Sequence, residues 1–253
     1  MTEIISSLQN NRVKLARQLQ EKARLRRKER KIVLEGVRLI ADALAVGYKP
    51  LFVFYESQHA DYELIATLQD QQIQLIPVSA DVIRHLSDTQ NPQGIIAVFP
   101  LPEPALPQKP ERILILDAIR EPGNMGTILR TAGAAGVEVV ILAADCVDPY
   151  NPKVLRSGMG AHFRIPIVEA GWDQIRGYCD DLGVFLAAGD GDLNYTDVDW
   201  KNAWALVIGN EAHGIHQTVE GQRIAIPMAS ETESLNAAVA AGVILFEALR
   251  QRK

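Results

Sequence analysis

The chain has 253 residues, of which 47% are hydrophobic and 23% charged, with a formal net charge of −5. This composition is typical of a soluble globular protein, and the length suffices for two domains. No apolar run reaches the roughly 18 residues of a membrane span, and no signal-peptide pattern is present, which argues against a membrane or secreted protein and predicts a cytoplasmic location.

The charges are unevenly distributed, with a basic arm near the start of the chain. Between residues 12 and 31 there are ten Lys or Arg and two Glu, a net charge of +8, so the other 233 residues carry −13. A clustered basic stripe can follow a phosphate backbone even when the overall charge is negative. We predict a helix over 8–30 that contacts RNA or DNA; the alternative is an ordinary solvated helix face. The candidate contacts in the arm are Arg12, Lys14, Arg24, Arg26 and Arg27.

After the basic helix, strand-like and helix-like segments alternate up to residue 100. This alternation predicts a small α/β sandwich over 1–100, in which no catalytic cluster is apparent. A linker over 101–110 follows, because five prolines within eleven residues make that segment extended and semi-rigid. Strands are expected at 32–36, 51–55, 73–77 and 94–99, and helices at 37–46, 61–71 and 79–86.

Segments of the same two kinds alternate again over 111–253. They predict a mostly parallel open sheet with helices on both faces. Ligands of such sheets bind in the crevice beyond the carboxyl ends of the strands, so the residues that follow each strand are the first candidates for a site. Strands are expected at 113–117, 137–142, 184–188, 204–208 and 223–227, and helices near 125–135, 151–159, 172–181 and 235–251.

The segment 117–132 (DAIREPGNMGTILRTA) directly follows the first of these strands. We expect a turn in which Asn124 caps the next helix, whose free N–H groups suit an anion or a polar ligand. Arg130, six residues further on, would be costly in a core unless it were paired or lined a cavity. An ordinary strand–turn–helix with an exposed Arg fits this segment equally well. Neither GxGxxG nor GxxxxGK[ST] is present here, so a simple dinucleotide or ATP site is not indicated.

Two later segments also place polar residues at the ends of predicted elements. Gly209 follows a strand and would let a ligand approach the backbone, while Glu211 could accept hydrogen bonds from ligand hydroxyls or pair with Arg130. Ser234 is expected to cap the last helix, and Asn236, a poor helix former, to have a side-chain partner. The alternatives are a loop Glu in water and a small-residue helix that packs on its neighbour.

The chain offers no recognisable metal site. Cys146 and Cys179 do not form a CxxC pair and are expected to be buried free thiols. The five histidines include no HExxH, and His213 and His216 are only three residues apart in a loop-like segment, so we expect no metal.

Together, the three segments resemble the SpoU (TrmH-type) family of RNA ribose 2′-O-methyltransferases. The motifs occur in the same order and at matching spacings, and residues 151–161 resemble the segment between the first two. The N-terminal domain is similar to the family's substrate-binding domain, through residues 8–10, the basic helix and residues 34–36. One departure is 236–239, which reads Asn-Ala-Ala-Val where relatives often carry Asn-Val-Ser-Val. The matching residues are Asn124-x-Gly126-x-x-x-Arg130-Thr131-Ala132, then Ile208-Gly209-Asn210-Glu211, and Ile226-Pro227-Met228 with Ser234-Leu235-Asn236.

The resemblance implies an α/β-knot methyltransferase domain (SPOUT-type, with a deep trefoil knot) over 111–253, one of the rare exceptions to the rule against knots. It also implies S-adenosylmethionine as cofactor and a homodimer whose active sites lie close to the subunit interface. RNA would be bound by the N-terminal domain and the basic arm, with Lys153 and Arg156 near the site. The cofactor would be held by the backbone of Gly209, Ile226 and Leu235, with Met228 nearby.

The implied reaction is methyl transfer from the sulfonium of S-adenosylmethionine to a ribose 2′-hydroxyl. Asn124 would orient the ribose or Arg130, Glu211 would hold Arg130 or a ligand hydroxyl, and Ser234 and Asn236 would shape the cofactor and acceptor site. The Arg that matches Arg130 has been proposed as the family's general base. Because a guanidinium has a pKa above about 12, we expect Arg130 to act instead as an electrostatic clamp on the ribose oxygen and adjacent phosphate, with phosphate or water accepting the proton.

Ribosomal RNA is the expected substrate, because the tRNA enzymes of the family that modify the D-loop generally lack a full N-terminal α/β domain. The alternatives are a tRNA 2′-O-methyltransferase, a non-catalytic RNA-binding relative, and a nucleotide-dependent enzyme on a doubly wound sheet. The missing phosphate-loop spacing disfavours the last of these.

Overall fold

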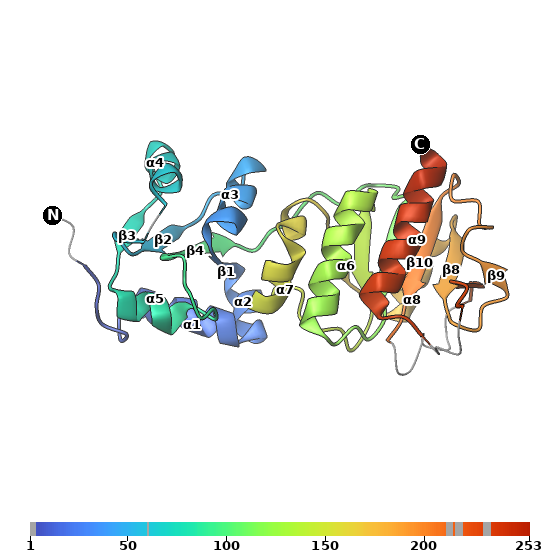
Figure 1. The fold of residues 1–253 in the computed structure, drawn as a ribbon, viewed down its shortest axis with the longest axis horizontal. Coiled ribbons are helices and arrows are strands. Elements are labelled where there is room, and N and C mark those ends of the chain that lie inside the picture. The colour runs from blue at the N-terminus through green and yellow to red at the C-terminus, as the bar shows by residue number, and fades with distance from the viewer. Residues whose placement is uncertain (1–3, 60, 211–214, 216–219, 230–233) are drawn as a thin grey trace. The chain divides into compact units, whose positions relative to one another are not determined.

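The computed structural model describes residues 4–59, 61–210, 215, 220–229 and 234–253 (Figure 1). Its contacts divide the chain into two compact units. The N-terminal unit comprises the residues up to Glu103 together with Tyr150–Phe163, and the C-terminal unit comprises Pro104–Pro149 and Arg164–Lys253. No helix of the described residues is long and apolar enough to cross a membrane.

The N-terminal unit is built on a four-stranded sheet in the order β1-β4-β2-β3. The elements are β1 (Lys31–Glu35), β2 (Phe52–Tyr55), β3 (Leu75–Pro77), β4 (Ile95–Pro100), α1 (Asn11–Glu21), α2 (Ala23–Glu29), α3 (Val37–Ala45), α4 (Tyr62–Asp70) and α5 (Ala80–Leu86). Strand β4 pairs antiparallel with β1 and β2, and β2 pairs parallel with β3. Because successive strand residues point to opposite faces, Val33 and Phe54 pack with α1 and α5, whereas Ile32 and Val53 pack with α3 and α4. The predicted α/β sandwich is confirmed.

The basic arm forms two helices rather than the single helix expected over 8–30. The chain leaves the helical conformation at Lys22, whose φ and ψ are −119° and 104°. The guanidinium of Arg26 then turns back and donates from Nη1 to the carbonyl oxygens of Leu19 and Gln20, at 2.6 and 3.0 Å. It thereby satisfies carbonyls that the end of α1 would otherwise leave without donors.

One short segment within 111–253, expected to be a continuous domain, belongs instead to the N-terminal unit. Helix α7 (Pro152–Gly158) and the 3₁₀ turn η1 (Ala161–Phe163) belong to the N-terminal unit. Leu155 and Phe163 are buried in the cluster on the α3 and α4 side of the small sheet, and the ring of Phe163 lies 4.9 Å from that of Tyr48. Apolar burial therefore assigns this segment to the first unit, although the sequence reads as part of the second.

The C-terminal unit contains a seven-stranded sheet in the order β7-β6-β5-β10-β8-β11-β9, with parallel pairing throughout. Its elements are β5 (Arg112–Leu116), β6 (Val139–Leu142), β7 (Ile167–Glu169), β8 (Gly183–Ala187), β9 (Leu193–Asn194), β10 (Trp204–Ile208), β11 (Gln222–Ala225), α6 (Pro122–Ala135), α8 (Trp172–Cys179) and α9 (Ala237–Arg252). Helix α8 covers one face through Ile175, and α6 and α9 lie side by side on the other (Figure 1). The predicted parallel sheet is confirmed; β7 and β9 were not predicted, because two or three residues are too short for a periodic pattern.

The strand order of the C-terminal unit contains a topological switch point. From β5 the chain runs outward to β6 and β7, and it then returns to the other side of β5 to form β8, β10 and β11. Ligands of open α/β sheets bind beyond the carboxyl ends of the strands at such a point. The ends of β5, β10 and β8 are therefore where a site is expected.

Candidate active site

The first motif forms the beginning of α6. The helix starts with Pro122 at its first turn, and the N-cap is Glu121, whose Oε1 accepts a hydrogen bond from the backbone N–H of Gly123 at 3.3 Å. The expectation that Asn124 caps this helix is wrong, because Pro122 fits the first helical position and moves the cap one residue ahead of itself. Asn124 instead lies within the first turn, and its side chain bonds to another element.

That other element is α9. Its N-cap is Asn236, whose Oδ1 accepts from the backbone N–H groups of Ala238 and Val239 at 3.0 and 3.3 Å, so the expectation of Ser234 as cap is wrong. The Nδ2 of Asn236 donates to Oδ1 of Asn124 at 3.0 Å. The side-chain partner expected for Asn236 is thus found 112 residues away. One amide caps a helix and joins the starts of α6 and α9.

Arg130 projects from a different side of α6. Asn124 and Thr131 face α9, where a Cβ built at Gly242 would lie 3.8 Å from Cγ2 of Thr131. At 3.6 residues per turn, Arg130 is rotated by about 120° from Asn124. Its side chain is exposed, and within the part of the chain that the structure describes it makes no hydrogen bond or ion pair. Glu211, its predicted partner, lies outside the described residues.

A cavity of ≈ 200 Å³ lies at the carboxyl ends of β8, β10 and β11 and against the start of α9. All four residues predicted to hold a cofactor line it, together with Ser234, whose side chain is exposed. Ser234, Leu235 and Ala237 flank the Asn236 cap, so the cavity adjoins the Asn124–Asn236 bond. The predicted cofactor residues in its wall are Gly209, Ile226, Met228 and Leu235.

The chemistry of this wall fits S-adenosylmethionine. Ile208, Ile224 and Ile244 provide an apolar surface for a planar base. Small residues from the end of β8 and the first turns of α9 leave backbone groups accessible for directional hydrogen bonds. The polar and charged side chains in the described wall are few, as is usual for a small-molecule site: Asp190, Asn210, Arg223 and Ser234.

The sequence analysis missed Asp190 and Arg223 in this wall, and it named Asn210 within a motif without giving it a role. Asn210 donates from Nδ2 to the carbonyl of Ala118 at 3.2 Å and so ties the end of β10 to the end of β5. Asp190 and Arg223 form an ion pair across the cavity wall. Asp190 follows the strand predicted at 184–188, and its position at a strand end was the available signal; no feature of the sequence singled out Arg223.

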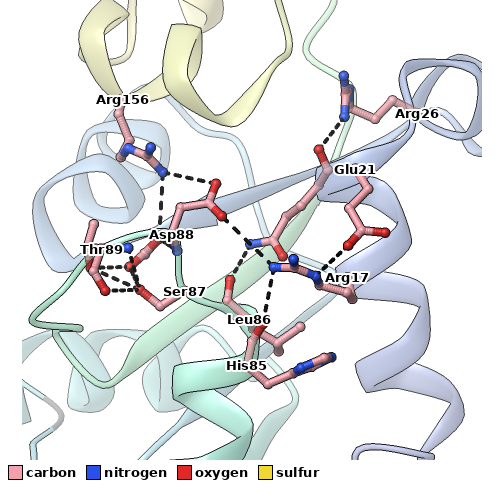
Figure 2. Close-up of polar contacts among 11 residues, drawn as sticks. Arg17, Glu21, Arg26, His85, Leu86, Ser87, Asp88, Thr89 and Arg156 are labelled. Carbon is pink, nitrogen blue, oxygen red and sulfur yellow. Dashed lines mark hydrogen bonds and ion pairs between the residues drawn. The ribbon is translucent and has the colours of Figure 1, made fainter.

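The residues predicted to contact RNA differ in how exposed their side chains are. Arg12, Lys14, Arg24 and Arg27 are exposed, as is Lys153 at the start of α7, and the guanidinium of Arg12 lies 5.6 Å above the ring of Phe52. Arg26 is only 3% exposed, which contradicts its prediction as an RNA contact. Its charge is used to satisfy the carbonyls of Leu19 and Gln20 at the end of α1, and Figure 2 shows the Arg26 guanidinium making such a hydrogen bond.

Arg156, also predicted to bind RNA, is engaged within the N-terminal unit. Its Nη1 lies 3.8 Å from Oε2 of Glu35 and 3.6 Å from Oδ2 of Asp88. Figure 2 shows the Arg156 side chain pointing toward the Ser87–Thr89 turn. Because two carboxylates already compensate this charge, Arg156 is poorly suited to recruit a phosphate.

The two cysteines are partly buried thiols rather than the fully buried ones expected. Burial raises the pKa of both Cys146 and Cys179 to about 11, so neither is a nucleophile near neutral pH. Both are free, as predicted. Among the described residues there is no group of three metal-binding side chains, and His213 and His216 lie outside that part of the chain.

Comparison with known proteins assigns both units. The model of the SpoU rRNA Methylase family matches residues 111–246, and that of the MRM3-like substrate binding domain matches residues 10–97. The match over residues 111–246 assigns the parallel α/β sheet, with the cavity at its switch point, to the methyltransferases of the SpoU class. The chain belongs to the SpoU rRNA methylase family, and the family predicted from the three motifs is confirmed.

Individual relatives agree with this assignment. The chain is 36% identical to the mitochondrial rRNA methyltransferase 3 of Mus musculus, over 89% of this chain and 69% of that protein. It is 32% identical to the 23S rRNA (guanosine(2553)-2′-O)-methyltransferase RlmP of Bacillus subtilis, over 96% and 97% of the two chains. A solved structure of an AdoMet-bound rRNA methyltransferase from Sinorhizobium meliloti is similar with a TM-score of 0.85 and 32% identity, and the likeness covers 98% of both chains.

Proposed function

We propose that this protein transfers the methyl group of S-adenosylmethionine to a ribose 2′-hydroxyl of ribosomal RNA. The observation that carries the proposal is the cavity wall, which contains all four predicted cofactor residues and adjoins the Asn124–Asn236 bond. The similarity to rRNA methyltransferases over nearly the whole chain supports the substrate class. The cofactor supplies an already activated methyl group, so the protein has to align donor and acceptor and manage one proton.

The residues of the chain divide this work between them. The Asn124–Asn236 bond fixes the starts of two parallel helices, whose N-terminal ends favour negative charge such as a phosphate or a developing alkoxide. Arg130, exposed on α6, clamps the ribose oxygen and the adjacent phosphate. Ser234 borders the cofactor and the acceptor. The proton passes to phosphate or water, because the guanidinium stays protonated.

The proposal is tested by mapping 2′-O-methyl groups in total RNA from cells with and without this protein. We expect one or a few ribosomal positions to lose methylation without it. A change confined to tRNA would support the tRNA alternative instead. The non-catalytic alternative predicts no change at any position, and calorimetry would then be expected to show no binding of S-adenosylmethionine.

The trefoil knot and the homodimer belong to the same proposal. Helix α9 exposes Val239 and Phe246 by 52% and 49%, and because they are seven residues apart they lie on one side of the helix. Exposed apolar side chains in line are typical of a subunit interface. We expect sedimentation to give a dimer for the wild type and a monomer for Phe246→Glu. Tyr62→Glu, which changes an exposed aromatic residue of the N-terminal unit, is the control and should leave the dimer intact.

A further inference from the structure

One ion pair lies in the wall of the cavity, formed by Asp190 and Arg223. Nη2 of Arg223, on β11, donates to Oδ1 of Asp190, in the turn that follows β8. Among the described residues that line the cavity, these two alone carry a charge. The pair is net neutral, so it cannot select a ligand by overall charge; its value to a ligand lies in directional hydrogen bonds.

The backbone holds Asp190 in place. The N–H of Ala188 donates to the carbonyl of Ile224 at 2.9 Å, and the N–H of Gly191 donates to that of Ala188 at 3.3 Å. The turn is pressed so closely against β11 that a Cβ at Gly191 would lie 2.5 Å from the carbonyl carbon of Ile224. These contacts fix the backbone of the turn beside the cavity, and the ion pair with Arg223 orients the Asp190 carboxylate, whose side chain is 78% exposed and so open to a ligand.

The chemistry and position of this carboxylate point to one group of the cofactor. Arg223 occupies Oδ1, and an ionised carboxylate has capacity for further donors. The two hydroxyls of a ribose are such donors, and a carboxylate at the end of a strand is a known way for α/β proteins to bind them. Asn236 is bonded to Asn124 in α6, the helix that follows β5, and marks the acceptor side, whereas Asp190 follows β8 and Arg223 lies on β11, two and three strands from β5 in the sheet. Neighbouring strands are about 4.8 Å apart. The separation between the acceptor side and the ion pair therefore fits a cofactor whose methyl group faces the acceptor and whose nucleoside extends away from it.

We propose that Asp190 binds the ribose hydroxyls of the adenosyl group and that Arg223 positions Asp190 for this contact. The inference rests on the proposed function in one respect, the identity of the cofactor. It makes Asp190 a cofactor-binding residue that the sequence motifs do not include. Arg223 acts through Asp190 and is a positioning residue.

Calorimetry with three ligands tests the assignment on the full-length protein. S-adenosylmethionine, S-adenosylhomocysteine and 5′-methylthioadenosine share the adenosyl group, but the second lacks the charged sulfonium and the third also lacks the amino-acid part. We expect Asp190→Ala to weaken all three about tenfold or more, because a hydrogen bond to a charged acceptor is lost in each complex. Arg223→Ala should weaken all three by less, and Arg223→Lys should recover part of that loss.

The matched control is Asp173→Ala, which removes the acidic member of another Asp–Arg pair, on α8 and away from the cavity. It should leave all three affinities unchanged, and thermal melting checks that every variant is folded. A loss confined to the two ligands with an amino-acid part would overturn the inference and assign the pair to that end. Unchanged affinities in Asp190→Ala would also overturn it. If the wild type binds none of the three ligands, the cofactor assignment itself fails, which is a separate outcome.

Discussion

At the scale of single residues, Arg130 differs from Asn124 and Asn236 because its side chain is not bonded to another described element. It is exposed on α6, about 120° around the helix from Asn124, and no described residue pairs with it. An exposed guanidinium that is not already paired keeps all of its donors for an incoming ligand. This supports its assignment to the RNA side of the reaction rather than to the helix scaffold.

The clamp assignment makes a prediction about Arg130→Ala and Arg130→Lys. We expect Arg130→Ala to slow single-turnover methyl transfer by about 10²–10³-fold, the usual effect of removing one group that stabilises developing charge. Arg130→Lys should recover little, because Lys keeps the charge but not the two-pronged geometry. Arg176→Ala, at an exposed Arg on α8, is the control and should react normally. A Lys variant with most of the wild-type rate would contradict a bidentate role.

The residue types of the site were predictable from the sequence, but their local roles were not. The motifs identified Asn124 and Asn236 as polar residues in unusual places. Because Asn is a poor helix former, a side-chain partner was also predicted for Asn236. Which of the two caps a helix depends on where the helix starts, and Pro122 decides that for α6. The bond between them joins segments 112 residues apart, a pairing that depends on the packing of α6 against α9.

At the scale of elements, the break between α1 and α2 changes the meaning of the basic arm. Propensity alone predicts one continuous helix there, because Arg, Lys and Leu are all good helix formers. The tertiary structure overrides it by turning the chain at Lys22, and the buried guanidinium of Arg26 satisfies the carbonyls of Leu19 and Gln20. A residue that reads as an RNA contact is therefore part of the scaffold.

This role predicts that Arg26→Ala destabilises the N-terminal unit. Two hydrogen bonds from a charged donor are lost and two carbonyls are left unsatisfied, so we expect a loss of about 1.5–3 kcal/mol in the free energy of unfolding. Arg24→Ala, two residues away on the exposed side, should change it by no more than about 0.5 kcal/mol. Chemical denaturation followed by circular dichroism measures both. Equal stabilities of the two variants would mean that Arg26 does not support the turn.

Residues Leu34-Glu35-Gly36, at the end of β1, also belong to the scaffold rather than to an RNA-binding surface. Oε1 of Glu35 accepts from Oγ1 of Thr89 at 2.8 Å, and its other oxygen lies 3.8 Å from Arg156. Gly36 has a φ of +98°, and a Cβ there would lie 2.8 Å from Oε1 of Gln93. These residues join the end of β1 to the Ser87–Thr89 turn and to α7, so the resemblance in this part of the chain reflects packing.

At the scale of the whole molecule, the charge distribution remains the strongest argument for RNA binding, but the structure reduces the number of cations involved. Of the ten in residues 12–31, Arg26 is buried, and Arg17, Arg30 and Lys31 form ion pairs with Glu21, Glu103 and Glu29. Arg27 is exposed but has an interaction of its own, and the other exposed cations that form none of these ion pairs are Arg12, Lys14, Lys22, Arg24 and Lys28.

The salt dependence of RNA binding tests this reduced set. Each neutralised phosphate of a single strand contributes about −0.7 to the slope of log K against log salt, so these five cations contribute at most about −3.5. We expect Lys14→Ala with Arg24→Ala to make the slope shallower by about 1.4. Lys109→Ala, at an exposed Lys that pairs with Asp181, should leave the slope unchanged. Fluorescence anisotropy with a labelled single-stranded RNA measures the slope, and a flat salt response in the wild type would rule out backbone binding by the arm.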